Sequence, residues 1–381
     1  FINRAGTMVL PFLSKYLKED LHFSYSQVGW IMVSFGCGSI LGSWLGGKLS
    51  DKIGFYKIMI FSLLTSGFAF FGLQFVKSFE GLLIAMFLIM TVADMFRPAM
   101  FVSLGAYAKP ENRTRALTLV RLAINLGFAA GPALGGLLIM SVGYKGLFWV
   151  DGTSCILAIL IFWIKVKEKK KSKYTDKEHP GEVLTHSVFK DTPFWIFLTG
   201  TLITGILFFQ LFTTIPLYHK EQFNLSEFQT GLLLTLNGVL VFFMEMPIVS
   251  YIEKHKINKL KVITYGCLAM AISIYLLLVN NWAGILIIMM IFMTFAEMFA
   301  FPFSNSFAMS RAPKGHEGRY MAIFTMSYSL AHILSAKTGM EIIALFSYQN
   351  NWFFMGTLGV IGVILFIWTN KLVAKEPPRN L

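Results

Sequence analysis

Long apolar stretches recur along the whole chain, separated by short clusters of charged residues, glycine or proline. A helix needs about 20 predominantly apolar residues to cross the hydrocarbon core of a bilayer, and most of these stretches have that length. The pattern predicts twelve membrane-spanning helices, at 1–16, 26–47, 57–76, 81–106, 116–140, 146–164, 194–218, 227–251, 260–280, 282–306, 318–342 and 351–371.

One long polar stretch, residues 165–193, interrupts this pattern; it is basic at its start and poor in apolar periodicity. We expect it to be a cytoplasmic linker between an N-terminal six-helix half, 1–164, and a C-terminal six-helix half, 194–381. The halves are related in sequence, since "MTVADMF" at 90–96 aligns with "MTFAEMF" at 293–299. Six is an even number, so both copies enter the membrane in the same sense, as parallel repeats.

The composition supports an all-α integral membrane protein. With 55% hydrophobic and 14% charged residues, the chain of 381 residues has too few polar side chains to coat a water-soluble globule. Its three cysteines, Cys37, Cys155 and Cys267, fall in three different predicted helices at no metal or disulfide spacing, so we expect packed thiols and no metal site.

The net charge of +13 is a topological signal and does not indicate nucleic acid binding. If both termini are cytoplasmic, 24 of the 33 Lys and Arg residues lie on cytoplasmic segments. Five lie in outer loops, Lys15, Lys18, Lys77, Lys145 and Lys220, and four lie within the membrane, Arg4, Arg97, Arg121 and Lys337. This bias predicts cytoplasmic termini by the positive-inside rule.

The loop "GGKLSDKIGFYK", residues 46–57, resembles the cytoplasmic signature loop of the major facilitator superfamily. Phe55 and Tyr56 stand where that family usually has basic residues. The resemblance implies that Asp51 contacts the end of a neighbouring helix and latches one transport state, although a solvated loop charge is the alternative. The matching latch positions are Gly47, Asp51, Lys52 and Gly54.

The stretch "NLGFAAGPALGG", residues 125–136, resembles a motif of the drug:proton antiporter branch with twelve spans; Thr118 replaces its usual earlier glycine. Glycines four residues apart let helix backbones approach closely in lipid, so the motif serves packing, gating or both. Its positions are Gly127, Gly131, Pro132, Gly135 and Gly136. The superfamily resemblance implies twelve helices in two parallel six-helix repeats around a central cavity.

Charged residues inside predicted spans are the sharpest signal, because one unpaired charge in hydrocarbon costs at least ~2.5 kcal/mol on insertion scales. Asp94 lies about 20 Å from the cytoplasmic end of its span, counting ~1.5 Å per residue, and Arg97 follows on the same helix face. Arg4 also lies near mid-membrane. Asp94 is therefore either in a static ion pair with Arg4 or Arg97, or a cavity carboxylate whose protonation is coupled to the substrate.

Glu297 occupies the position equivalent to Asp94 in the second half, but Ala300 stands where the arginine would be. Without a near partner, desolvation should favour its protonated form, which suits a proton carrier. Glu245 has the same character, and burial against the helix bend at Pro247 is the competing account.

Further polar residues inside spans are candidates for the substrate cavity. Arg121 and Asn125 share a helix face and suit an anion or hydroxyl, or bonding to a neighbouring helix. His332 and Lys337 can titrate or bind, while Lys337 has Glu341 four residues on as a simple ion-pair partner. Uncharged hydrogen-bonding candidates are Gln210, Asn237 and Asn305.

These features predict a proton-coupled secondary transporter that works by alternating access, with no cofactor and no enzymatic site. The leading interpretation is an efflux antiporter for amphipathic drugs or metabolites, since the interior is rich in Phe and Met. The alternative is a proton-coupled symporter that imports a peptide, sugar or organic anion. We expect a monomer in the bacterial inner membrane, with a small-molecule substrate, protons and lipid as its partners.

Overall fold

The computed structural model describes residues 2–5, 8–107, 113–168, 188–279, 281–312 and 317–376. Within these ranges every regular element is helical. Ten helical stretches of the described residues are long and apolar enough to cross a membrane. The structure thus confirms the all-α class, while the number of twelve spans and the layout of the two repeats stay predictions.

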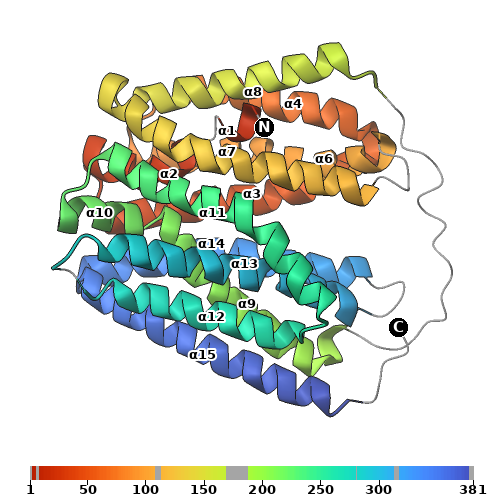
Figure 1. Cartoon of the computed structure of the whole chain (residues 1–381). Helices are drawn as coiled ribbons and strands as arrows, with labels where there is room; N and C mark the ends of the chain where they lie inside the picture. Colours follow the sequence, from red (N-terminus) through yellow and green to blue (C-terminus); the bar gives the residue numbers. More distant parts are fainter. Residues whose placement is uncertain are drawn as a thin grey trace. The chain divides into compact units, whose positions relative to one another are not determined.

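The described residues group into two compact units, each of which combines three separate segments of the chain. Unit 1 holds residues 1–173, 212–242 and 336–344, and unit 2 holds 174–211, 243–335 and 345–381. In the first unit, α4 (Phe55–Leu73) lies beside α8 (Lys145–Lys165), and in the second, α12 (Lys259–Leu276) lies beside α13 (Ile285–Arg311) and α15 (Tyr348–Ala374) (Figure 1).

Unit 1 contains the following helices: α1 (Ile2–Ala5), α2 (Val9–Lys15), a π-helical turn (Tyr16–Asp20), α3 (Tyr25–Ile53), α4 (Phe55–Leu73), α5 (Phe79–Ala93), α6 (Phe96–Tyr107), α7 (Arg113–Val142), α8 (Lys145–Lys165) and α10 (Ile215–Phe223). Unit 2 contains α9 (Thr192–Phe209), α12 (Lys259–Leu276), α13 (Ile285–Arg311) and α15 (Tyr348–Ala374). Two helices contribute to both units, α11 (Glu227–Lys254) and α14 (Glu317–Leu345).

Helix starts follow ordinary capping chemistry. Ser24 accepts from the backbone N–H of Gln27, whose side chain in turn accepts from the N–H of Ser24, so α3 begins with a capping box. Gly54, between α3 and α4, has a φ of 94°, a left-handed conformation that glycine adopts without a steric penalty.

The predicted span 81–106 is not one continuous helix, because α5 ends at Ala93 and α6 begins at Phe96. Pro98 explains the break: it has no N–H to offer to the carbonyl of Asp94 four residues earlier, and its ring would crowd that carbonyl. Asp94 therefore lies at an interruption of its span.

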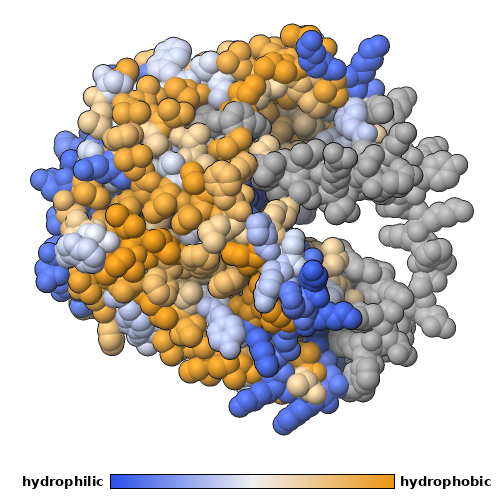
Figure 2. Space-filling view, in the orientation of Figure 1, coloured by the Kyte–Doolittle hydropathy of each residue, from blue (hydrophilic) through white to orange (hydrophobic). Residues whose placement is uncertain are grey.

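Large apolar side chains cover much of the visible surface (Figure 2). Trp163, Phe243 and Phe353 are each more than 60% exposed, at 61%, 68% and 63%. A water-soluble protein rarely exposes so much contiguous apolar surface, whereas helices that face lipid do so by necessity.

Candidate functional site

Unit 1 contains a cavity of about 100 Å³ beside the interruption at Asp94. Residues of α1, α4, α5, α6 and α8, together with Asp94 itself, line it. They are Asn3, Leu63, Ser66, Phe70, Met90, Ala93, Asp94, Phe96, Arg97, Asp151, Ser154 and Cys155. Two carboxylates, one guanidinium, one amide, two hydroxyls and one thiol thus line one small space inside the spanning part of the chain.

Asp151 on α8 is the most deeply buried carboxylate of this cavity, at 3% exposure. Its Oδ1 accepts from the backbone N–H of Met8 at 2.7 Å, and its Oδ2 accepts from the N–H of Val9 at 3.1 Å. These N–H groups open α2, where Met8 has no side-chain cap of its own. Both carboxylate oxygens therefore hold the start of α2 against α8.

Asp94 is half-buried and accepts a short hydrogen bond from the hydroxyl of Ser39 on α3. Arg97 lines the same cavity but is exposed, and within the described residues no ion pair joins it to Asp94. The side chain of Arg4 lies outside the described part, so the predicted pair between Asp94 and Arg4 stays a prediction.

Among the described side chains, the other N-terminal candidates are not part of the lining of this cavity. Asn125 on α7 is half-buried and takes part in a hydrogen bond or another polar contact. The side chains of Arg121 and Asp51 lie outside the described residues. Lys52 is exposed and Gly47 half-buried, and the latch role of this loop stays a prediction.

The carboxylates of the second half differ from each other. Glu245 on α11 is buried at 8% exposure, and Glu297 on α13 is half-buried. Both take part in polar or electrostatic contacts, so the expectation that Glu297 is isolated is not met. Its role as a proton carrier stays a prediction.

Gln210 lies fully buried in a network inside unit 2. Its Nε2 donates to the carbonyl of Ser335 at 2.9 Å and to the Ser335 hydroxyl at 2.8 Å, and its Oε1 accepts from Asn351 at 3.3 Å. This amide therefore ties α14 and α15 to the end of α9.

The remaining cavity candidates occupy varied environments. His332 is buried with its ring edge-on to Phe209, at 4.8 Å between centroids. Lys337 forms the simple ion pair with Glu341 and lies 4.2 Å from the Trp30 ring centroid. Asn237 is half-buried and Asn305 is exposed.

The glycine motif of α7 packs directly on α11. A Cβ atom at Gly136 would clash with the carbonyl of Glu227, and one at Gly231 would clash with the carbonyl of Pro132. A Cβ at Gly238 would lie 2.6 Å from the Cα of Ala129. The two backbones thus touch along the motif, a geometry that suits both packing and gating.

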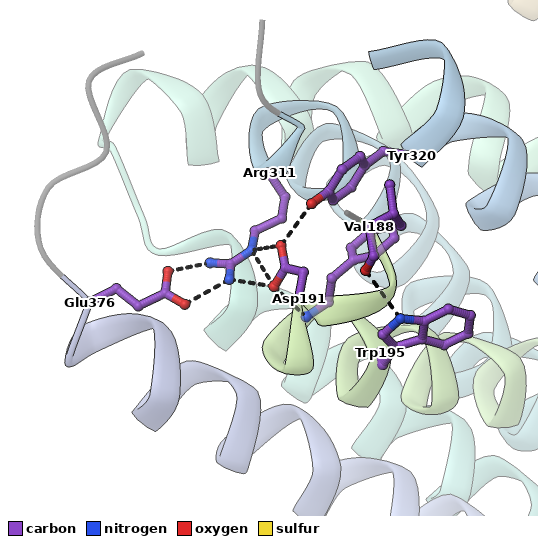
Figure 3. Close-up of polar contacts among 7 residues, drawn as sticks. Val188, Asp191, Trp195, Arg311, Tyr320 and Glu376 are labelled. Atoms are coloured by element: carbon purple, nitrogen blue, oxygen red, sulfur yellow. Dashed lines mark hydrogen bonds and ion pairs between the residues drawn. The ribbon is translucent and has the colours of Figure 1, made fainter. Parts of the chain in front are cut away.

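Unit 2 holds a buried polar cluster that the sequence analysis did not predict (Figure 3). Asp191, which caps α9, accepts from Arg311 Nη2 at 2.6 Å and Nε at 2.9 Å, and from the Tyr320 hydroxyl at 3.0 Å. Arg311 also donates to both oxygens of Glu376, at 2.6 and 2.7 Å. Burial alone would raise the pKa of Asp191, but the bonds and charge of Arg311 outweigh it and hold that pKa below its ordinary value.

Sequence reasoning also missed Asp151, Lys15 and His219. Asp151 carried the same signal as Asp94, because it is also a carboxylate within an apolar span. The high cost of burying an unpaired charge in hydrocarbon therefore marks it equally. Lys15 was assigned to an outer loop, yet its side chain is fully buried against Glu227. Nothing in the local sequence marks that contact, because its partner lies 212 positions away.

Comparisons with known proteins agree with this architecture. The chain is 23% identical to a Na⁺, Li⁺, K⁺/H⁺ antiporter of Planococcus maritimus, with 100% of the chain and 96% of that protein covered. It is 25% identical to the quinolone resistance protein NorA of Staphylococcus aureus, with 76% and 74% covered.

Solved structures share the fold. The nucleoside transporter NupG superposes with a TM-score of 0.78 at 13% identity, covering 97% of each chain. The POT family transporter PepTSo gives 0.79 at 16% identity, covering 99% of this chain and 97% of its own. The sequence profile described as Major Facilitator Superfamily matches residues 1–336. The chain belongs to this superfamily and is a multi-pass membrane transporter, not an enzyme.

Proposed function

We propose that this transporter is a proton-coupled antiporter of the bacterial inner membrane, with both termini cytoplasmic. It exports amphipathic drugs or metabolites by exposing a central binding site alternately to the two sides. The similarity to two proteins named as an antiporter and a drug-resistance protein supports exchange over uptake.

The cavity that holds Asp94 and Asp151 is the observation that carries the proposal. An ionised Asp151 accepts from two N–H groups through its two oxygens. A protonated carboxyl has one oxygen that is itself a donor, so one of these two bonds weakens. Proton occupancy of Asp151 is thereby linked to how firmly α2 is held on α8.

The cavity is too small to be the binding site of the exported solute, so the proton and the solute bind at different sites in this proposal. A drug-sized ligand fills a pocket of about 300–1,000 Å³. The cavity of about 100 Å³ admits protons, a few water molecules or a small ion, but not such a ligand. Its carboxylates and hydroxyls offer oxygen ligands to a monovalent cation, although Arg97 adds a positive charge to the same lining. The similarity to a protein named as a Na⁺, Li⁺, K⁺/H⁺ antiporter makes cation/proton exchange a second candidate function.

Antiport is tested with purified protein in proteoliposomes. Their interior is acidic and contains a pH-sensitive dye whose fluorescence is quenched at low pH. Ethidium, norfloxacin, NaCl and KCl are added in turn. Antiport predicts loss of internal protons when a transported solute is added. Proton uptake together with the solute, driven in the opposite gradient, would show symport and would overturn the proposal.

Four single variants assign the proton site: Asp94→Asn, Asp151→Asn, Glu297→Gln and Glu245→Gln. We expect at least tenfold slower gradient-driven exchange in Asp94→Asn and Asp151→Asn. Glu80→Gln removes an exposed carboxylate in the first turn of α5 and is the matched control. Undiminished exchange in both aspartate variants, with loss in Glu297→Gln or Glu245→Gln, would move the site to the second half.

A further inference from the structure

A second group of ionisable residues, buried or half-buried, lies within unit 1 where α2 contacts α10 and where Lys15 of α2 reaches Glu227 of α11. We call Lys15, Glu19, Tyr144, His219 and Glu227 the Lys15 cluster. Lys15 is fully buried, with its Nζ 3.1 Å from Glu227 Oε1 and 3.9 Å from Glu19 Oε1. The Tyr144 hydroxyl donates to Glu19 Oε2 at 2.8 Å.

His219 on α10 is the unusual member of this cluster. Its side chain is fully buried, and neither ring nitrogen has a hydrogen-bond partner among the described residues. Native proteins seldom leave a buried imidazole in this state without a functional reason or an ordered water. Burial first, and the charge of Lys15 second, lower the pKa of His219 to about 3, so the ring is neutral here.

The surrounding charges balance only while His219 is neutral. Lys15 and Lys220 are the cations, and Glu19 and Glu227 are the carboxylates, so two positive charges meet two negative ones. Glu221, the next residue on α10, is occupied by the Tyr25 hydroxyl. The remaining charged neighbours, Lys18 and Asp20, lie at the rim of the group. A proton on His219 adds a third cation beside Lys15.

We propose that His219 is a proton-binding site, separate from the coupling carboxylates, whose occupancy releases the Lys15–Glu227 ion pair and lets α10 and α11 part from α2. In the proposed orientation, on which this inference rests, the cluster lies at the outer end of the helices. Protons from the outside then open that end, which is the step that an exporter needs for releasing its solute.

The size of the effect follows from linkage. In the open form His219 reaches water and takes its ordinary pKa of about 6.5, against about 3 in the closed form. A group whose pKa is lower in the closed form leaves that form stable above pH 6.5 and destabilises it as the pH falls below 6.5. The ratio of open to closed molecules should rise about tenfold between pH 7.5 and pH 5.5.

The opening is measured as the distance distribution between two spin labels, on Lys77→Cys and Gln222→Cys, in nanodiscs. The labels are attached at neutral pH to protein without the native cysteines. Both positions are exposed and belong to unit 1. The long-distance population should grow about tenfold on acidification. His219→Gln, which cannot be protonated, should abolish the response, and His22→Asn, an exposed histidine with positive φ, should retain it.

Lys15→Met provides a second variant if His219→Gln does not fold. Without Lys15, a protonated His219 can pair with Glu227, so acid should no longer favour the open form. A pH response that survives in His219→Gln, or a wild-type protein with no response, overturns the inference. The measurement uses no solute and no gradient, so it gives its result whether exchange proves to be antiport or symport.

Discussion

Replacing Asp191 by asparagine tests the buried polar cluster of unit 2. Asparagine preserves the shape and still caps α9 through its side-chain oxygen, so the change isolates the negative charge. The loss leaves Arg311 with Glu376 as its remaining carboxylate in the cluster, and with weaker bonds where Asp191 stood.

The expected cost follows from the geometry. Breaking a buried ion pair by removing one partner costs about 3–5 kcal/mol when the remaining charge is left alone. Because Glu376 still accepts two hydrogen bonds from Arg311, we expect about 2–4 kcal/mol. The side chain of Glu376 is 27% exposed, so Glu376→Gln should cost only about 1 kcal/mol.

Cys267 provides the assay, because it is fully buried in the core of unit 2. With Cys37 and Cys155 changed to serine, reaction of Cys267 with a thiol dye reports opening of this unit in detergent. A loss of 2–4 kcal/mol corresponds to labelling about 30- to 900-fold faster when reclosing outpaces the reaction.

Acid gives an independent check. A lowered pKa means that the stability contributed by Asp191 is complete above its ordinary pKa of about 3.9 and is lost only as the pH falls through the lower native value. Between pH 8 and pH 5 the wild-type unit should show no loss from this group. Labelling of Asp191→Asn within threefold of wild type, or no faster than in Glu376→Gln, would refute the reasoning.

Two further predictions concern helix packing and topology. Gly231→Ala should push α11 away from α7 and lower the thermal stability of purified protein, whereas Gly72→Ala, where a Cβ meets nothing within 4 Å, should not; equal melting temperatures would contradict this. Single cysteines at Lys171 and Lys220 should differ in intact cells, with an impermeant thiol reagent labelling 220 but not 171, and the reverse pattern would invert the predicted orientation.

The fold class was predictable because its signal is local. Each spanning helix needs only about 20 consecutive apolar residues, and that requirement is visible without knowledge of neighbours. The break at Asp94 was also within reach, since Pro98 stands four residues on, yet the apolar run across it suggested one continuous helix.

The candidate site was predictable only in part. Asp94 stood out because it is a charge in an apolar run. The environment of Lys15 and His219 depends on α2, α10 and α11 coming together, and no spacing in the sequence reports that contact. Likewise Asp191 looked like a linker charge, and only the fold brings Arg311 from 120 positions away.

The glycines of α3 let this helix pack directly on the backbone of the segment that contains Asp94. A Cβ at Gly38, Gly42 or Gly46 would clash with a backbone carbonyl of Phe87, Thr91 or Met95, so α3 lies against the backbone of α5 and the start of α6. Ser39 joins the same pair of helices at Asp94.

Such close backbone contact opposes sliding of α3 along its neighbours, so we expect α3 to move together with the segment around Asp94. From Ser39 to Gly54, α3 runs about 22 Å at 1.5 Å per residue. Gly54, with its positive φ, lies at the far end of α3 and joins it to α4. If Asp94 binds the proton, as proposed, we expect the backbone of α3 itself to connect that event to the loop that ends α3.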